Sequence, residues 1–133
     1  MTRINTIEPV ELTRQHLLAE IRELPRVFTL VKNWKGSGVN YYNFKRIKKQ
    51  PQEYTLGTGH MVFFADKLQW LADRYELLCE EWRSRGYNIN QVNREDLLKG
   101  IDSKFLGGYT VTPEALEINR QRIADNIAAK QGE

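Results

Sequence analysis

Apolar side chains recur every three or four residues through much of the chain, and this spacing constrains the fold more than any other feature. Residues at such spacing share one face of an α-helix, which packs against a core. One such stripe lies between residues 58 and 86 and predicts a helix with Thr58 as its cap and Gly86 after its basic C-terminal end. Cys79 within it is expected to be a small buried apolar group. The stripe consists of Phe64, Leu68, Leu71, Tyr75, Leu78 and Trp82.

A similar stripe near the N-terminus predicts a long first helix from about Val10 to about Lys35. Pro25 lies inside this range, and because proline lacks an amide N–H we expect the helix to be bent or interrupted there. The preceding "TRINTI" has no helical period and predicts an extended arm. The apolar positions of this stripe are Leu12, Leu17, Leu18, Ile21, Leu24, Phe28 and Val31.

The remaining segments predict a long connection and two further helices. Residues 36–58 are rich in Gly, Asn, Tyr and Lys, and loops of this length are usually functional or disordered. "NREDLLKGI" predicts a short helix, and a longer one follows Thr112, its expected cap, with Leu116, Ile123 and Ile127 buried. No stretch alternates strongly with a period of two. We therefore predict an all-α fold, a single compact domain over residues 1–133 of about three main helices, with an extended N-terminal arm and a long basic loop between the first two helices.

Composition indicates the class of protein. The 133 residues are 41% hydrophobic, which suits one domain with a modest core. No apolar run approaches the ~20 residues of a membrane span, and the first residues lack the basic and apolar regions of a secretory signal. Cys79 is the single cysteine, so no internal disulfide can form. We expect a cytoplasmic, monomeric protein without a membrane partner.

Positive charge is concentrated in one part of the chain. Between Leu24 and Gln52 there are seven cationic side chains and no acid, although the whole chain has a net charge of only +3. Aromatic residues lie among these charges, which favours an interaction with the phosphates and bases of nucleic acid over a merely solvated loop. The cations are Arg26, Lys32, Lys35, Lys45, Arg46, Lys48 and Lys49.

Few motifs for metal or nucleotide chemistry are present. The chain has no glycine-rich phosphate loop followed by a strand, no cysteine pair for zinc and no HExxH motif. His16, Glu20 and Glu23 share one helical face and could supply metal ligands, although this spacing often arises by chance. Arg22 and Arg26 lie on an adjacent face. This face could bind an anionic ligand near Glu23, or it could be a surface array of ion pairs; the pattern alone leaves both open.

The N-terminus offers a second candidate group. Thr2 is small, so Met1 would normally be removed, leaving a free threonine α-amine. An α-amine titrates near ~7.7–8.0, against ~10.4 for lysine, so part of it is neutral at physiological pH. A neutral amine can form a Schiff base with a carbonyl-like carbon. Arg3 would hold a phosphate beside it.

Four segments together resemble the pyrimidine dimer DNA glycosylase family. They are "MTRIN" at the start, "QHLLAEIRELPRVF" at 15–28, "GTGHMVFFADKL" at 57–68 and "RGYNI" at 85–89. The resemblance implies a compact all-α repair enzyme that cleaves the glycosidic bond of a damaged pyrimidine and then nicks the backbone. It implies that the Thr2 α-amine attacks C1′ of the deoxyribose to give an imine, followed by β-elimination, and that Glu23 directs proton transfers and stabilises the cationic intermediate.

The same resemblance implies the partner and the rest of the site. The partner is double-stranded DNA containing damaged pyrimidines, and neither a cofactor nor a metal is required. Binding is expected to involve base extrusion and to weaken steeply with salt. The DNA contacts transferred from the family are Arg3, Gln15, His16, Arg22, Arg26 and Arg122.

The sequence also departs from the family pattern. Asn90 replaces a lysine of the phage member, the tail lacks its basic and aromatic segment, and the connection over 36–58 is longer and more basic. The lesion preference is therefore open, and the "NYYNFKRIKK" segment is a candidate for additional DNA contacts. Three other functions stay open: a catalytically silent DNA-binding module, a glycosylase and lyase for a different modified base, and a metal-dependent hydrolase.

Overall fold

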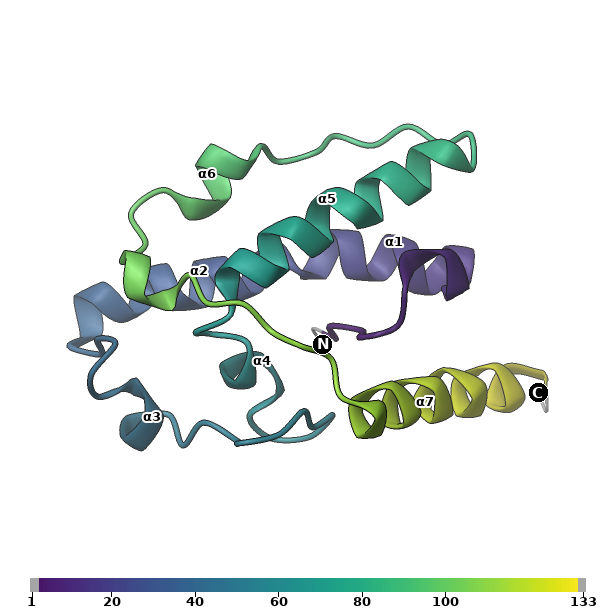
Figure 1. The fold of residues 1–133 in the computed structure, drawn as a ribbon. Coiled ribbons are helices and arrows are strands. Elements are labelled where there is room, and N and C mark those ends of the chain that lie inside the picture. Colours follow the sequence, from purple (N-terminus) through teal and green to yellow (C-terminus); the bar gives the residue numbers. More distant parts are fainter. Residues whose placement is uncertain (1–2, 132–133) are drawn as a thin grey trace.

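The computed structural model describes residues 3–131 and is helical, with no strand among these residues. This confirms the predicted all-α class. Figure 1 shows helices α1, α2 and α5 side by side, with α3, α4 and α7 on one side of them and α6 on the other. The α-helices are α1 (Arg14–Glu23), α2 (Pro25–Trp34), α3 (Phe44–Ile47), α4 (His60–Phe63), α5 (Leu68–Ser84), α6 (Arg94–Leu98) and α7 (Pro113–Gln131). Three short 3-10 turns are η1 (Pro9–Glu11), η2 (Lys35–Ser37) and η3 (Ser103–Phe105).

The predicted first helix is interrupted at Pro25, as expected, but it begins at Arg14 and not near Val10. Thr13 caps α1, and its hydroxyl accepts the His16 amide N–H at 3.2 Å. Val10 is 64% exposed in a 3-10 turn, and Leu12 is buried in extended backbone, so the apolar pattern continued beyond the helix itself. Pro25 is the first residue of α2, where its missing N–H costs least.

The stripe predicted over 64–82 is buried and forms the centre of one hydrophobic cluster. Helix α5 packs this face against α1, and Cys79 is fully buried beside it, as expected. The expected single helix is, however, two helices, α4 and α5, and Thr58 caps neither of them. The separating turn is held by a distant segment, because the Gly107 amide donates to the Asp66 carbonyl at 3.0 Å and the Gly107 carbonyl accepts from the Trp70 amide at 3.3 Å.

The long connection between the first two predicted helices is ordered by aromatic packing. Phe44 on α3 is fully buried, and its ring lies 5.7 Å from that of Trp34 and 5.4 Å from that of Phe105. Tyr54 is buried as well, whereas Tyr42 is 77% exposed. The connection therefore packs on the core as part of the fold.

The two C-terminal helices are present as predicted, and Thr112 is the cap expected for the second of them. The Asn93 side chain accepts the Asp96 amide at the start of α6, and Thr112 accepts the Ala115 amide at 3.1 Å at the start of α7. Ile123 is buried as predicted, whereas Leu116 and Ile127 are only partly buried. The fully packed positions of α7 include Ala115 and Asn119, because this helix lies against the N-terminal arm (Figure 1).

Candidate active site

The N-terminal arm is extended, as predicted, and its backbone is held by side chains. Ile4 is clamped on both polar groups: its amide donates to His60 Nε2 at 2.7 Å, and its carbonyl accepts from the Tyr54 hydroxyl at 2.8 Å. The other nitrogen of His60 lies 2.6 Å from the Thr55 carbonyl, so Nδ1 carries the proton. Burial raises the pKa of Tyr54, which keeps its hydroxyl a donor.

Helices α5 and α7 bind the next part of the arm. Asn119 on α7 is fully buried, and its Oδ1 accepts the amides of Thr6 at 2.8 Å and Ile7 at 3.2 Å. Arg74 on α5 donates to the Ile7 carbonyl at 2.9 Å. Unpaired buried backbone groups are costly, so these bonds stabilise one position of the arm. The arm thus lies between two helices that are distant in sequence (Figure 1).

A buried ion pair links the arm to α1. Arg74 donates to both carboxylate oxygens of Glu20, at 2.5 Å from Nε and 3.0 Å from Nη2. The Asn5 amide nitrogen donates to Glu20 Oε1 at 2.6 Å. Asn5 Oδ1 in turn accepts from Asn119 at 2.7 Å and from Arg122 at 3.0 Å. Both oxygens of Glu20 are therefore occupied by structural partners.

This arrangement argues against the metal-site interpretation of His16, Glu20 and Glu23. His16 Nδ1 lies 2.6 Å from the Thr13 hydroxyl, at the helix cap, and Glu20 is bound to Arg74. Among residues 3–131, no group of three His, Cys, Asp or Glu side chains is placed to hold a metal ion. Glu20 belongs to the fold, which leaves Glu23 as the acid of this face that can meet a ligand.

Charged groups converge where the arm ends. Burial lowers the pKa of the Arg122 guanidinium, and the charge of Arg3 lowers it too, while Tyr54, Glu20 and Glu23 raise it. Arg122 therefore lies within electrostatic reach of both Arg3 and Glu23. The Glu23 side chain is 20% exposed, and its Oε1 lies 3.9 Å from Nη1 of Arg26. An anion entering here would meet several cations around one accessible carboxylate.

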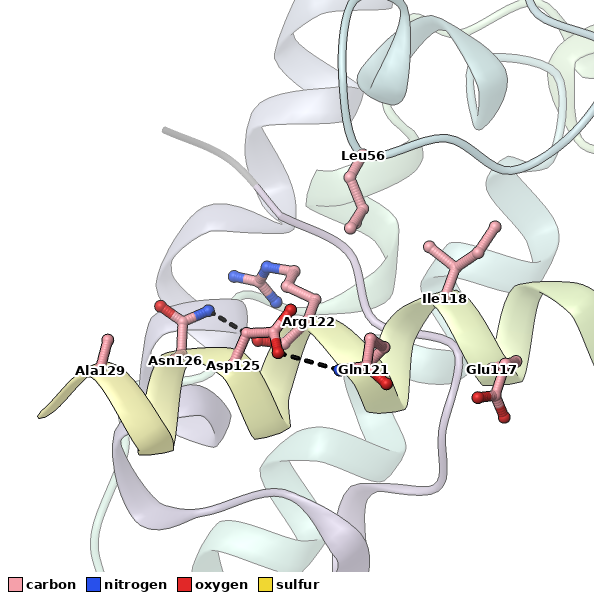
Figure 2. Close-up of a pocket in the computed structure, with 8 residues that line it drawn as sticks. All are labelled: Leu56, Glu117, Ile118, Gln121, Arg122, Asp125, Asn126 and Ala129. Carbon is pink, nitrogen blue, oxygen red and sulfur yellow. Dashed lines mark hydrogen bonds between the residues drawn. The ribbon is translucent and has the colours of Figure 1, made fainter. Parts of the chain in front are cut away.

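Two grooves adjoin this end of the arm, separated by Leu56. One of about 500 Å³ is lined by Arg3, by Leu30 of α2 and by residues 56–62. The other, of about 600 Å³, lies along α7 and includes Arg122. Figure 2 shows Leu56 reaching toward α7, with Ile118 and Arg122 on the facing side of that helix. Both grooves are open to a ligand that contacts the arm.

The predicted site residues are only partly brought together. Arg122 lies within electrostatic reach of both Arg3 and Glu23, and Arg26 lies beside Glu23. Gln15 and Arg22 are exposed on α1, and His16 is partly buried at its cap. Thr2, the predicted nucleophile, lies outside the described residues.

Sequence reasoning missed the side chains that hold the arm. Two of them carried a detectable signal, because Arg74 and Asn119 are polar residues on otherwise apolar helical faces. A polar residue at such a position needs a buried partner. Asn5, Tyr54 and His60 gave no comparable signal, since their partners are 15 to 114 residues away in sequence.

Comparison with protein-family models places this geometry in a known context. The model described as "Pyrimidine dimer DNA glycosylase" matches residues 1–95, more than half of the chain. The chain belongs to the pyrimidine dimer DNA glycosylase family. It is therefore a DNA repair glycosylase in the coarse sense that the family defines. Helix α7, with Asn119 and Arg122, lies beyond the matched residues. None of the helices in residues 3–131 is both long and apolar enough to cross a membrane.

Proposed function

We propose that the protein is a bifunctional DNA N-glycosylase and abasic-site lyase that removes damaged pyrimidines from double-stranded DNA as a monomer in the cytoplasm. The observation that carries this proposal is the side-chain cage around residues 4–7, formed by Tyr54, His60, Arg74 and Asn119. This cage fixes the arm next to Arg3, and Arg122 lies within electrostatic reach of both Arg3 and Glu23. A nucleophile at the N-terminus requires such a support, because an unrestrained terminus would rarely occupy a reactive position. The cyclobutane pyrimidine dimer is the first lesion to test.

In the proposed reaction the neutral α-amine of Thr2 attacks C1′ of the damaged nucleotide. The bond from C1′ to the base breaks, the base leaves with the electron pair and takes up a proton, and an imine forms as the sugar ring opens. Loss of a proton from C2′ then expels the 3′ phosphate, and water releases the protein from the imine. Amine catalysis of this kind needs no metal or cofactor.

Glu23 is the carboxylate suited to move these protons. Its side chain is partly exposed and faces Arg26, whereas both oxygens of Glu20 are occupied by Arg74 and Asn5. A carboxylate at this position can also stabilise the cationic sugar intermediate. We assign phosphate and base contacts to Arg3, Gln15, His16, Arg22, Arg26 and Arg122. The arginines among them can neutralise the phosphates of a duplex from which a base is extruded.

Borohydride reduction tests the proposal directly. Protein with Met1 removed is incubated with duplex DNA containing either a pyrimidine dimer or an abasic site, and the imine is reduced to a stable adduct. We expect an adduct at Thr2 and a nicked strand. Protein that retains Met1 or is acetylated at Thr2 should form none.

A variant of Glu23 tests the catalytic role assigned to this residue. Glu23→Gln should abolish turnover on the dimer and retain much of the DNA affinity, because the cations that bind DNA are unchanged. Full activity of Glu23→Gln would refute the assignment of proton transfer to Glu23. Absence of an adduct from correctly trimmed protein would leave a silent DNA-binding module, and an adduct with other lesions only would indicate a different modified base.

A further inference from the structure

The connection between α2 and α4 carries a cluster of exposed cations that the proposed reaction does not use. We call it the α3 basic patch; its members are Lys45, Arg46, Lys48 and Lys49. All four side chains are exposed, and that of Lys45 is 63% exposed. The nearby carboxylate of Asp66 lies 3.9 Å from Lys45 Nζ and offsets one of the charges. The patch therefore keeps a strong positive charge.

The patch is built on a packed platform. Phe44, within α3, is inserted among the rings of Trp34, Tyr41 and Phe105. Lys48 lies over the Trp34 ring at 5.9 Å. A buried aromatic anchor inside a run of cations holds their backbone in place, so less conformational entropy is lost when these cations bind a ligand.

The patch is connected to the groove at the end of the arm. The side-chain Nε2 of Gln50, the residue directly after the patch, donates to the carbonyls of Val62 at 3.3 Å and Phe63 at 3.2 Å on α4. Pro51 packs against Gly59 so closely that a Cβ at Gly59 would lie 2.6 Å from Pro51 Cγ. The segment 56–62 lines the groove that Arg3 borders. In Figure 1, α3 and α4 lie on the same side of the α1–α2 and α5 helices as the arm.

We propose that the α3 basic patch is a second DNA-binding surface, which contacts the phosphates of the duplex flanking the lesion. This inference rests on the proposed function, because it takes DNA as the ligand of the neighbouring groove. Four closely spaced cations on an ordered turn suit consecutive backbone phosphates, which present one negative charge per ~1.7 Å of duplex. The patch extends the binding footprint and adds affinity without taking part in the chemistry.

The test compares two double variants with equal loss of charge. Arg46→Gln with Lys49→Gln removes two exposed cations of the patch. The control, Arg83→Gln with Lys99→Gln, removes two exposed cations outside the patch, one on α5 and one directly after α6. Binding is measured to a duplex with a stable abasic analogue, over a range of salt concentrations.

Duplex length provides the second variable. A chain of this size has a radius of gyration of about 14 Å. Arms of about 20 base pairs on each side of the lesion therefore extend past the protein, whereas an arm trimmed to about 4 base pairs spans only ~14 Å at ~3.4 Å per base pair. Each side is trimmed in turn while the other stays long, so that the duplex remains paired.

We expect the patch variant to reduce the slope of log affinity against log salt by about 1.8, which is ~0.9 for each lost phosphate contact. Lowering the salt concentration from 1 M to 0.1 M should therefore widen the difference in affinity between wild type and the patch variant by at most about 60-fold. The patch variant should also lose part of the preference for the long duplex over one of the trimmed duplexes, whereas wild type and control should keep this preference in full. Borohydride trapping at saturating abasic DNA should be unchanged.

Three results would overturn the inference: equal behaviour of the patch variant and wild type, equal losses in the patch and control variants, or no length dependence in wild type. The proposed function is judged separately by trapping. Length-dependent binding without any adduct would refute the chemistry and keep the patch, whereas a normal adduct with an inert patch would do the opposite.

Discussion

Acidification should destabilise the protein through His60, which anchors the arm. His60 is 3% exposed, and as a neutral ring it donates from Nδ1 to Thr55 and accepts at Nε2 from Ile4. With a proton on Nε2, the N–H groups of His60 and Ile4 would both be donors and the hydrogen bond between them would be lost. The pKa of His60 is lowered from 6.5 to about 4: burial is the main cause, the bond to Thr55 opposes it, and the charges of Arg3 and Arg122 contribute to the lowering.

The size of the effect follows from this pKa difference. With 6.5 in the unfolded chain and about 4 in the folded one, the unfolded state binds more protons over the interval between them. Each pKa unit corresponds to ~1.36 kcal/mol, so His60 accounts for a loss of about 3 kcal/mol in the free energy of unfolding. Stability is undiminished above pH 6.5, falls as the pH approaches 4, and is lowered no further by His60 below that value.

Urea unfolding at constant ionic strength, between pH 7 and pH 4, measures this contribution. In His60→Gln the side-chain oxygen can replace Nε2 as acceptor for Ile4 but does not titrate. The difference in unfolding free energy between wild type and this variant should therefore change by about 3 kcal/mol across the interval. His16→Gln, which leaves His60 in place, should retain the loss of stability that His60 causes. Parallel loss of stability in wild type and His60→Gln would refute the reasoning.

Two substitutions test the rest of the cage. Asn119→Ala leaves two buried arm amides unpaired and should lower the free energy of unfolding by about 2–6 kcal/mol, with weaker borohydride trapping. Asn126→Ala, at an exposed position of the same helix, should leave the free energy of unfolding nearly unchanged. Glu20→Gln leaves the Arg74 charge unpaired and should lower the free energy of unfolding by about 3–5 kcal/mol in urea. Glu23→Gln should lower the free energy of unfolding less than Glu20→Gln does, and equal losses in the two glutamine variants would contradict the division between a structural and a catalytic acid.

Those parts of the fold that depend on local sequence were predictable. The buried stripe of α5, the break at Pro25 and the caps Asn93 and Thr112 follow from side-chain spacing and from the bonding capacity of a few residue types. The separation of α4 from α5 was not predictable in this way. It depends on Gly107, which reaches the Asp66 carbonyl from a segment 41 residues later.

The candidate site shows the same limit more strongly. Helical spacing placed Glu20 and Glu23 on one face, one turn apart, and gave no partner for Glu20. Only the position of Arg74 on another helix makes Glu20 a buried ion-pair partner, while Glu23 stays accessible. Periodicity predicts which residues share a face, but the partners of a polar residue on that face come from long-range packing.

Helix α7 shows how the site depends on a part of the chain beyond the family match. An extended arm has backbone donors and acceptors that no neighbouring strand satisfies, so side chains must supply the partners once the arm is buried. Residues 54–74 provide three of these side chains, and Asn119 of α7 provides the acceptor for two amides. The same helix contributes Arg122 to the charged end of the arm. The family match ends at residue 95, yet the amides of Thr6 and Ile7 have their acceptor on α7. Any substitution that weakens the packing of α7 on the arm should therefore lower activity and stability together.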